Sequence, residues 1–335
     1  LEKKKKKKNN THNPKNTSWV NRDRFVLSSG HGCMLQYSVL HLTGYESVTM
    51  DDLKQFRQWG SKTPGHPENF ETDGIEVTTG PLGMGISKGR GMAWAKRSRG
   101  RSGRVFVMTG DGEMQEGQNF EALQSTVQQG VGNLMIIVDH NKIQSDREVD
   151  RIVDLKDLIA KFSAFGWPVA RCDGHDQAAL ADVFEHFGKL GDVPKVLIAD
   201  TIKGRGVSFM EHPRALEEGG GFYRWHAGAP PDAEFAEAHA EIVARINARL
   251  AKEGLPAVGL EAVPPPPTLE PSYTLEGEPV STLASQPAFK VSDEYVAAAY
   301  GEALMAVAER RDDVVVLDAD LAADCRVRDF ELSHP

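Results

Sequence analysis

The fold class of this chain follows most directly from residues 104–124, RVFVMTGDGEMQEGQNFEALQ. Residues 104–109 are mostly apolar and rich in valine and phenylalanine, which predicts a buried strand. Two glycines around Asp111 then lead into residues 116–129, whose apolar positions recur with the period of a helix. A strand, a glycine turn and a helix in this order are typical of a parallel β-α-β unit.

The same alternation continues downstream. Short apolar runs predict further strands, and longer amphipathic segments predict the helices between them. The predicted strands are residues 134–139, 167–172 and 195–200, and the predicted helices are residues 155–165, 177–190 and 233–252. We therefore predict an α/β fold with an open, mostly parallel sheet and helices on both of its faces.

Composition divides the chain into four parts. Residues 1–11 contain a lysine run and are predicted to be a disordered basic tail, and residues 12–254 form the first domain. Residues 255–291 are predicted to be a proline-rich linker. Residues 292–335 begin a second α/β domain with a helix at 292–310 and a buried strand at 314–318. A domain of this length is incomplete. We therefore expect it to depend on additional residues or on a partner for its core.

Charge and composition exclude several classes of protein. The 48 acidic and 39 basic residues give a net charge of −9, which argues against a nucleic-acid partner. Apolar residues make up 40% of the chain and charged residues 26%, as in globular proteins. We expect no membrane partner and a cytoplasmic location, because no apolar stretch matches a bilayer span or a signal peptide. The three cysteines form no CxxC pair, so neither a zinc site nor a disulfide framework is indicated.

Polar residues follow two successive predicted strands. Gly110-Asp111-Gly112 follows the first, and Asn141 follows the second, 30 positions after Asp111. One β-α-β unit has about 30 residues, so both side chains should reach the same sheet edge. Glycines there let a phosphate approach the backbone and the free N–H groups of the next helix. An all-oxygen shell from a carboxylate, an amide, a backbone carbonyl and phosphates suits Mg²⁺ or Ca²⁺ rather than zinc.

The stretch from Gly110 and the stretch MIIVDHNKIQ from Met135 resemble the thiamine diphosphate motif of transketolases. Residues 12–45, 63–87, 203–211 and 224–232 are similar to other parts of the same domain, so the resemblance covers nearly all of residues 12–255. The segments AYGEAL and VVVLDADL near the end look like the opening of the family's pyrimidine-binding domain. The resemblance implies transfer of a two-carbon ketol unit from a ketose phosphate to an aldose phosphate, with thiamine diphosphate and Mg²⁺ (or Ca²⁺) as cofactors.

The resemblance also implies roles for individual residues. Asp111, Asn141 and the backbone carbonyl of Ile143 would hold the metal, and Gly112 would offer its N–H to the diphosphate. The other residues implied in cofactor binding are His31, Gly80, Pro81, Leu82, Gly110, Glu116 and His226. Of these, residues 80–82 match the loop against the aminopyrimidine ring. Glu116 matches a buried glutamate that links the two cofactor sites of a dimer.

Three histidines match catalytic positions of the family. His31 and His226 would contact the diphosphate and the substrate, and His66 would contact substrate hydroxyls. Imidazoles suit this work because they donate hydrogen bonds and exchange protons near neutral pH. The remaining histidines, including His140 and His175, are interpreted as structural or solvent-facing.

The sequence departs from the family at both ends. A lysine run stands where transketolases have a helix and an SGHPG loop with another histidine, and the glutamate that activates the aminopyrimidine belongs to a region after Pro335. The resemblance implies a site shared between two subunits, in a homodimer or with a partner chain. We therefore expect the isolated chain to turn over poorly or not at all.

Three alternatives stay open. Two are other thiamine diphosphate enzymes, namely a 1-deoxyxylulose-phosphate synthase and the alpha chain of a 2-oxo acid dehydrogenase, which share GDG and the metal asparagine. The segments TPGHPE, GPLGMGIS and WHAG favour transketolase over both. The third is a catalytically incomplete fragment or a subunit that needs a second chain.

Overall fold

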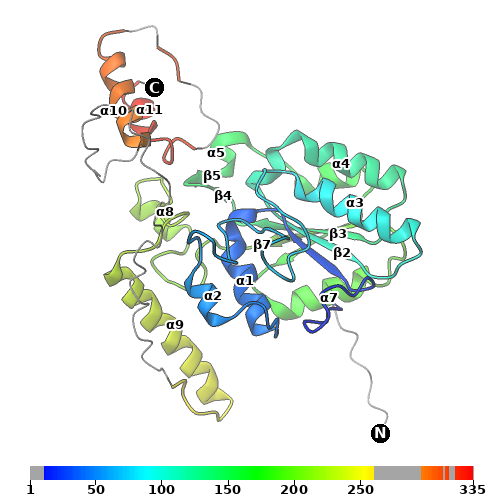
Figure 1. Ribbon diagram of the computed structural model, residues 1–335. Helices are drawn as coiled ribbons and strands as arrows, with labels where there is room; N and C mark the ends of the chain where they lie inside the picture. Colours follow the sequence, from blue (N-terminus) through cyan, green and yellow to red (C-terminus); the bar gives the residue numbers. More distant parts are fainter. Residues whose placement is uncertain (1–10, 260–295, 312–313, 317–320, 335) are drawn as a thin grey trace, which may run out of the picture. The chain divides into compact units, whose positions relative to one another are not determined.

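The computed structural model describes residues 11–259, 296–311, 314–316 and 321–334 (Figure 1). The chain divides into two compact units, Leu1–Ile242 and Val243–Pro335, with the division inside helix α9 (Asp232–Lys252). The predicted tail, apart from Thr11, and residues 260–291 of the predicted linker lie outside the described residues. Residues 255–259 are exposed and irregular.

A five-stranded parallel sheet forms the centre of the first unit, with the strand order β1-β2-β3-β7-β6. Its strands are β1 (Arg24–Leu27), β2 (Val105–Gly110), β3 (Leu134–His140), β6 (Val169–Asp173) and β7 (Lys195–Asp200). A separate antiparallel pair consists of β4 (Ile143–Gln144) and β5 (Arg147–Glu148). The four strands predicted from the sequence are confirmed, whereas the edge strand β1 was not predicted.

The helices complete the described fold. They are α1 (Cys33–Leu42), α2 (Met50–Lys54), α3 (Gly85–Ser98), α4 (Gly117–Gln128), α5 (Val149–Val153), α6 (Leu158–Ala164), α7 (Gln177–Phe187), α8 (Arg214–Glu218), α9, α10 (Val296–Ala308) and α11 (Arg328–Ser333), with 3₁₀ turns η1 (Gly30–Gly32) and η2 (Gly112–Gln115). The predicted helix at 155–165 begins only at Leu158, because the Asp157 side chain caps it by accepting the Ala160 N–H at 3.0 Å. Among the helices of the described segments, none is both long and apolar enough to cross a bilayer.

Helices cover both faces of the sheet, as the sequence predicted. On one face, α3, α4 and α6 bury Ile86, Leu123 and Phe162 in one cluster with Ile136 of β3. On the other face, α7 contributes Phe187 to a cluster with residues of β2, β3 and β7. Figure 1 shows α3 and α4 on one side of the strands and α7 on the other. Alternate residues of a strand point to opposite faces of the sheet, and both faces are covered by helices. The central strands are therefore almost continuously apolar.

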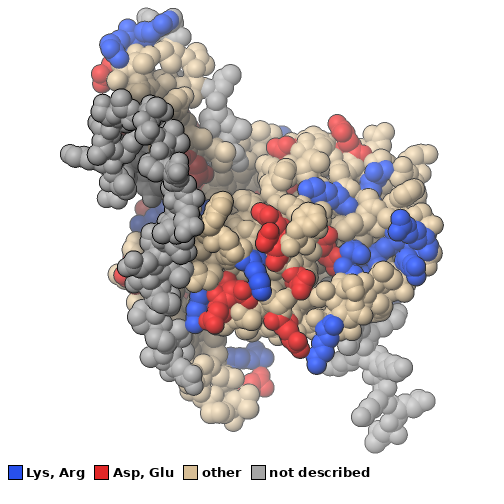
Figure 2. All heavy atoms as spheres, viewed as in Figure 1, with Lys and Arg blue, Asp and Glu red and all other residues tan. Residues whose placement is uncertain are grey.

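Charged side chains of both signs are interspersed over the described part of the face drawn in Figure 2, with basic ones gathered near the C-terminal end of α3. The last turn of α3 contains Lys96 and Arg97. Cations are favoured there by the helix dipole. Lys96 is buried and donates to the backbone carbonyls of Val20, Arg22 and Ser102 at 2.7–3.0 Å, so it also joins α3 to the chain before β1.

The second unit contains α10 and α11, which confirms the predicted helix at 292–310 over the part that is described. Close packing between the two helices depends on Gly301, because a Cβ there would lie 2.2 Å from the carbonyl oxygen of Arg326. The predicted buried strand at 314–318 is wrong for residues 314–316, which are irregular, with Val315 79% exposed. A strand needs a neighbour for its backbone groups, and no strand is described in this unit. Residues 317 and 318 lie outside the described segments.

We expect the centre of the first unit to be the most sensitive part of the fold. Ile136 is fully buried in β3, so Ile136→Ala should lower the free energy of unfolding by about 3 kcal/mol. The measurement is urea unfolding followed by circular dichroism. Ile159→Ala is the matched control on α6, where the side chain is 40% exposed, and should cost about 1 kcal/mol or less. Equal losses for the two variants would contradict this assignment of the core.

Candidate functional site

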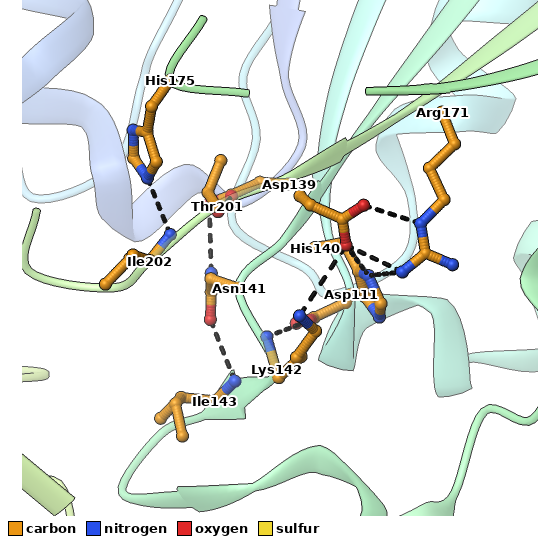
Figure 3. Close-up of polar contacts among 11 residues, drawn as sticks. Asp111, Asp139, His140, Asn141, Lys142, Ile143, Arg171, His175, Thr201 and Ile202 are labelled. Carbon is orange, nitrogen blue, oxygen red and sulfur yellow. Dashed lines mark hydrogen bonds and ion pairs between the residues drawn. The ribbon is translucent and has the colours of Figure 1, made fainter. Parts of the chain in front are cut away.

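Pairing between β2 and β3 brings the GDG turn to the turn after β3. Gly110 lies opposite Asp139 in the register, and the Asp111 N–H donates to the Asp139 carbonyl at 3.1 Å. The Asp111 carboxylate then accepts the N–H groups of Gly112 at 2.8 Å and Lys142 at 2.5 Å (Figure 3). The structure thus places Asp111 beside the Asn141 turn, as the strand spacing predicted.

The orientation of the Asn141 amide is fixed from two sides (Figure 3). Its Nδ2 donates to Asp139 Oδ2 at 3.1 Å, and its Oδ1 accepts the Ile143 N–H at 3.0 Å. Thr201 donates its hydroxyl to the other oxygen of Asp139. Lys142, between Asn141 and Ile143, has a φ of 69°, which is uncommon outside glycine and marks a tightly constrained turn.

The donor set fits a hard divalent cation. Asp111 is 1% exposed, and burial raises the pKa of its carboxyl, while the N–H groups of Lys142 and Gly112 lower it. A carboxylate in such a place gains from a nearby cation, and the oxygens of Asn141 and Ile143 are of the kind that Mg²⁺ and Ca²⁺ take. Within the described segments, no group of three or more His, Cys, Asp or Glu side chains is placed to hold a metal.

Glycine is required at position 112 for steric reasons. A Cβ there would lie 2.7 Å from Gln144 Cγ, closer than Cβ atoms approach other side chains. The backbone of the GDG turn can therefore pass this close to Gln144 only because residue 112 has no side chain. This observation fits the predicted use of that segment for a phosphate group.

Lys203 is a half-buried cation that was not predicted from the sequence to belong to the site. Its Nζ lies 2.8 Å from His226 Nδ1, and at 3.5 and 3.4 Å from the carbonyl oxygens of Ile143 and Ser145. Burial lowers the pKa of its ammonium group to about 8, against the opposing effect of nearby aspartates. The available signal was KGRG shortly after the strand 195–200, a third strand end on the same edge of the sheet.

The three predicted catalytic histidines come together. The rings of His31 and His226 have centroids 5.1 Å apart. The His66 ring lies over two glycines, since a Cβ on Gly30 or Gly80 would be 3.1 or 3.5 Å from its Cδ2. His31 and His66 keep exposed surface, whereas His226 is half-buried. The three histidines thus come from loops that are distant in sequence, with His226 beside His31 and His66 beside Gly30 and Gly80.

The protonation state of His226 follows from its neighbours. Burial first, and then the charges of Lys203 and His31, lower its pKa to about 3. An ammonium group only donates, so Nδ1 of His226 must accept from Lys203 and the ring proton is assigned to Nε2. Near neutral pH, His226 therefore presents Nε2–H as a fixed hydrogen-bond donor.

His140 and His175 have structural contacts, as predicted (Figure 3). His140 Nδ1 lies 2.9 Å from Asp200, which also binds Arg171 through its Nε at 2.6 Å. Chiefly through the Arg171 hydrogen bond, these neighbours lower the pKa of Asp200 to about 2. His175 Nε2 accepts the Ile202 N–H at 2.8 Å. Both rings thus fix the ends of strands rather than enter the histidine group.

The loop of residues 80–83 lies against the start of α4. Pro81 and Leu82 are exposed, and the Leu82 carbonyl accepts a hydrogen bond from Gln118 Nε2 at 2.8 Å. Gln118 Nε2 also donates to Glu116 Oε2 at 3.1 Å. Glu116 is half-buried within this chain and forms the N-cap of α4. The predicted cofactor-binding loop and the predicted dimer glutamate are therefore neighbours.

Comparison with known families agrees with this geometry. Residues 5–251 match the family described as transketolase, thiamine diphosphate binding domain. The chain belongs to this family. Its similarity to individual transketolases is substantial: 44% identity over 207 residues with the transketolase of a Nostoc species, and 51% over 226 residues with a chloroplastic transketolase of Arabidopsis thaliana. These alignments cover 58% and 62% of this chain, and 31% and 30% of the two relatives.

Solved transketolase structures show the same fold. A variant of the Pichia stipitis enzyme superposes with a TM-score of 0.59 and 34% identity, over 73% of this chain and 40% of that one. The Campylobacter jejuni enzyme gives 0.58 and 31%, over 73% and 42%. This chain therefore corresponds to less than half of a whole transketolase, and its first domain carries the family membership.

We expect His226 to remain neutral under mild acid. The His226 ring should show no protonation in NMR spectra between pH 8 and pH 5, because its pKa of about 3 lies well below this range. Lys203→Met removes the adjacent cation and keeps most of the apolar part of the side chain, so the pKa of His226 should rise above its value in the unaltered chain. Lys189→Met, at an exposed lysine of another segment, is the control. A midpoint near 6.5 in the unaltered chain would contradict the assignment.

Proposed function

We propose that this chain carries the thiamine diphosphate and metal half-site of a transketolase. The observation that supports this most is the meeting of the GDG turn with the Asn141 turn, where Lys142 N–H binds Asp111 Oδ2. Family membership alone gives the class of cofactor, whereas this contact joins the two segments that carry the motif. The proposed metal ligands are Asp111, Asn141 and the carbonyl of Ile143.

Mg²⁺ is the proposed metal, with Ca²⁺ as a substitute. Asp111 supplies one anionic oxygen, and the amide of Asn141, fixed by Asp139, supplies a neutral one. These ligands leave several coordination positions for phosphate oxygens and water. This suits an ion such as Mg²⁺, which keeps part of its hydration shell. Lys203 shares the carbonyl of Ile143 at 3.5 Å and adds positive charge on the side where a diphosphate would lie.

The chain's own residues have distinct proposed tasks. His226 Nε2–H donates to a diphosphate oxygen, and His31 and His66 face the substrate. The Gly112 N–H donates to Asp111 Oδ1 at 2.8 Å in the ligand-free chain and would exchange this acceptor for a diphosphate oxygen. The backbone of residues 80–82 supports the aminopyrimidine ring. When bound, thiamine diphosphate supplies the electron sink for breaking and forming a carbon–carbon bond beside a carbonyl. The protein contributes orientation, charge and proton positions.

The proposed reaction is transfer of a two-carbon ketol unit from a ketose phosphate to an aldose phosphate, as in the pentose phosphate pathway. This proposal rests on relatives named transketolase, of which the chain spans 22–31%. The site is proposed to be completed by a pyrimidine-binding domain, in a homodimer or from a partner chain. A cytoplasmic location stays a prediction, since the relatives include enzymes named chloroplastic. These relatives give no support to the two competing enzyme families, the 1-deoxyxylulose-phosphate synthases and the alpha chains of 2-oxo acid dehydrogenases.

Calorimetric titration of thiamine diphosphate into the chain, with Mg²⁺ and then with EDTA, tests the half-site. Binding should require the metal, because the diphosphate contacts the protein largely through it. Asp111→Asn should weaken binding about 100-fold or more, since even residues that only support metal ligands cost 10–100-fold. Asn141→Ala should behave in the same way.

Asp150→Asn is the matched control, because Asp150 is an exposed carboxylate outside the site. Its affinity for thiamine diphosphate should equal that of the unaltered chain, and circular dichroism should show that all variants are folded. Binding that is independent of Mg²⁺, or that survives Asp111→Asn, would exclude the proposed metal site. Absence of any binding to the folded chain would contradict the proposal that this chain binds the cofactor through its own half-site.

A further inference from the structure

Glu113 is a buried carboxylate to which the proposed function gives no task. It directly follows the GDG turn and is 4% exposed. Its Oε1 accepts the Ser28 hydroxyl and the Gly83 N–H, the latter at 2.9 Å, and its Oε2 accepts the Gly110 N–H at 3.3 Å. One side chain thus joins the segment after β1, the loop before α3 and the GDG turn.

Ser28 extends this connection. Its Oγ donates to Glu113 and accepts the Gly85 N–H at 3.1 Å, and the residue is 1% exposed. The loop is also pressed closely against these side chains. A Cβ on Gly85 would lie 2.2 Å from Ser28 Oγ, and a Cβ on Gly83 would lie 2.6 Å from Glu116 Cβ. The backbone of residues 83–85 is therefore held at two N–H groups by the pair Ser28 and Glu113.

Two of the three segments joined by Glu113 serve opposite ends of the cofactor in the proposed function. The GDG turn would bind the diphosphate, and residues 80–82 would support the aminopyrimidine ring. A ligand that contacts two separate loops binds tightly only if their spacing is fixed beforehand. A carboxylate suits this task because each of its two oxygens can accept from a different segment.

We propose that Glu113 is a positioning residue that fixes the loop of residues 80–85 at a set distance from the GDG turn. The inference rests on the proposed function for the identity of the ligand, but the contacts that hold the loop are independent of it. A glutamine has the same size but only one acceptor oxygen. Glu113→Gln therefore has to leave either the Gly110 N–H or the Gly83 N–H without its acceptor, whichever way the amide is turned, because a backbone N–H can only donate.

Hydrogen–deuterium exchange of the ligand-free chain tests the holding of the loop. Ser28→Ala should speed exchange in peptides covering residues 82–86 by about 10-fold, as expected from the loss of one hydrogen bond. Glu113→Gln should have the same effect either there or in peptides covering residues 108–112, according to whether the Gly83 or the Gly110 N–H loses its acceptor. Glu121→Gln is the control, because Glu121 is an exposed glutamate of α4, and it should leave these peptides unchanged. Unchanged exchange in both test variants would overturn the proposal.

Calorimetry with two probes then separates positioning from general stability. In the presence of Mg²⁺, Glu113→Gln should weaken thiamine diphosphate about 10-fold but change the affinity for inorganic diphosphate by about 2-fold or less, since the latter touches only one of the two loops. Equal weakening of both probes would indicate a merely structural role and overturn the proposal. If the unaltered chain binds neither probe, the proposed half-site fails, while the exchange experiment still decides whether Glu113 holds the loop.

Discussion

The register between β2 and β3 is the constraint on which the site depends. With Gly110 opposite Asp139, the Asp111 N–H reaches the Asp139 carbonyl, and the carboxylate of Asp111 reaches the N–H of Lys142. A slip by one residue would turn every side chain of the strand to the other face and carry Asp111 away from the Asn141 turn. The apolar clusters on both faces of the sheet prevent such a slip, so core packing and site geometry are determined together.

The site concentrates ionisable groups that are costly to bury. Asp111 and Glu113 are compensated largely by backbone N–H groups, and Lys203 by carbonyl oxygens, a histidine nitrogen and the face of the Tyr223 ring. Backbone groups at strand ends are rigid, so the charges are held before any ligand arrives. Burying these ionisable groups lowers the stability of the fold but holds the groups in fixed positions. This is typical of a binding site and not of an ordinary core.

Prediction from the sequence succeeded where the signal was local. β2, β3 and β7 have nearly continuous apolar runs, and the GDG and Asn141 turns follow the first two, so the meeting of these turns could be inferred from spacing. β1 is only four residues long and begins with Arg24, so its place at the sheet edge depends on pairing with β2. The roles of Lys203 and Glu113 depend on contacts with residues far away in the sequence. Ser28, for example, lies 85 positions before Glu113. No local pattern shows these contacts.

The two carboxylates of the segment GDGE have different tasks because of the turn that holds them. Asp111 caps the 3₁₀ turn η2, and Glu113 lies within it. A 3₁₀ helix has about three residues per turn, so side chains two positions apart point to different sides. Asp111 accordingly contacts the strand-end turn where a metal would bind, whereas Glu113 contacts Ser28 and Gly83 in the interior. One short turn can therefore present an anion to a ligand and, with its other carboxylate, anchor a second loop of the same site.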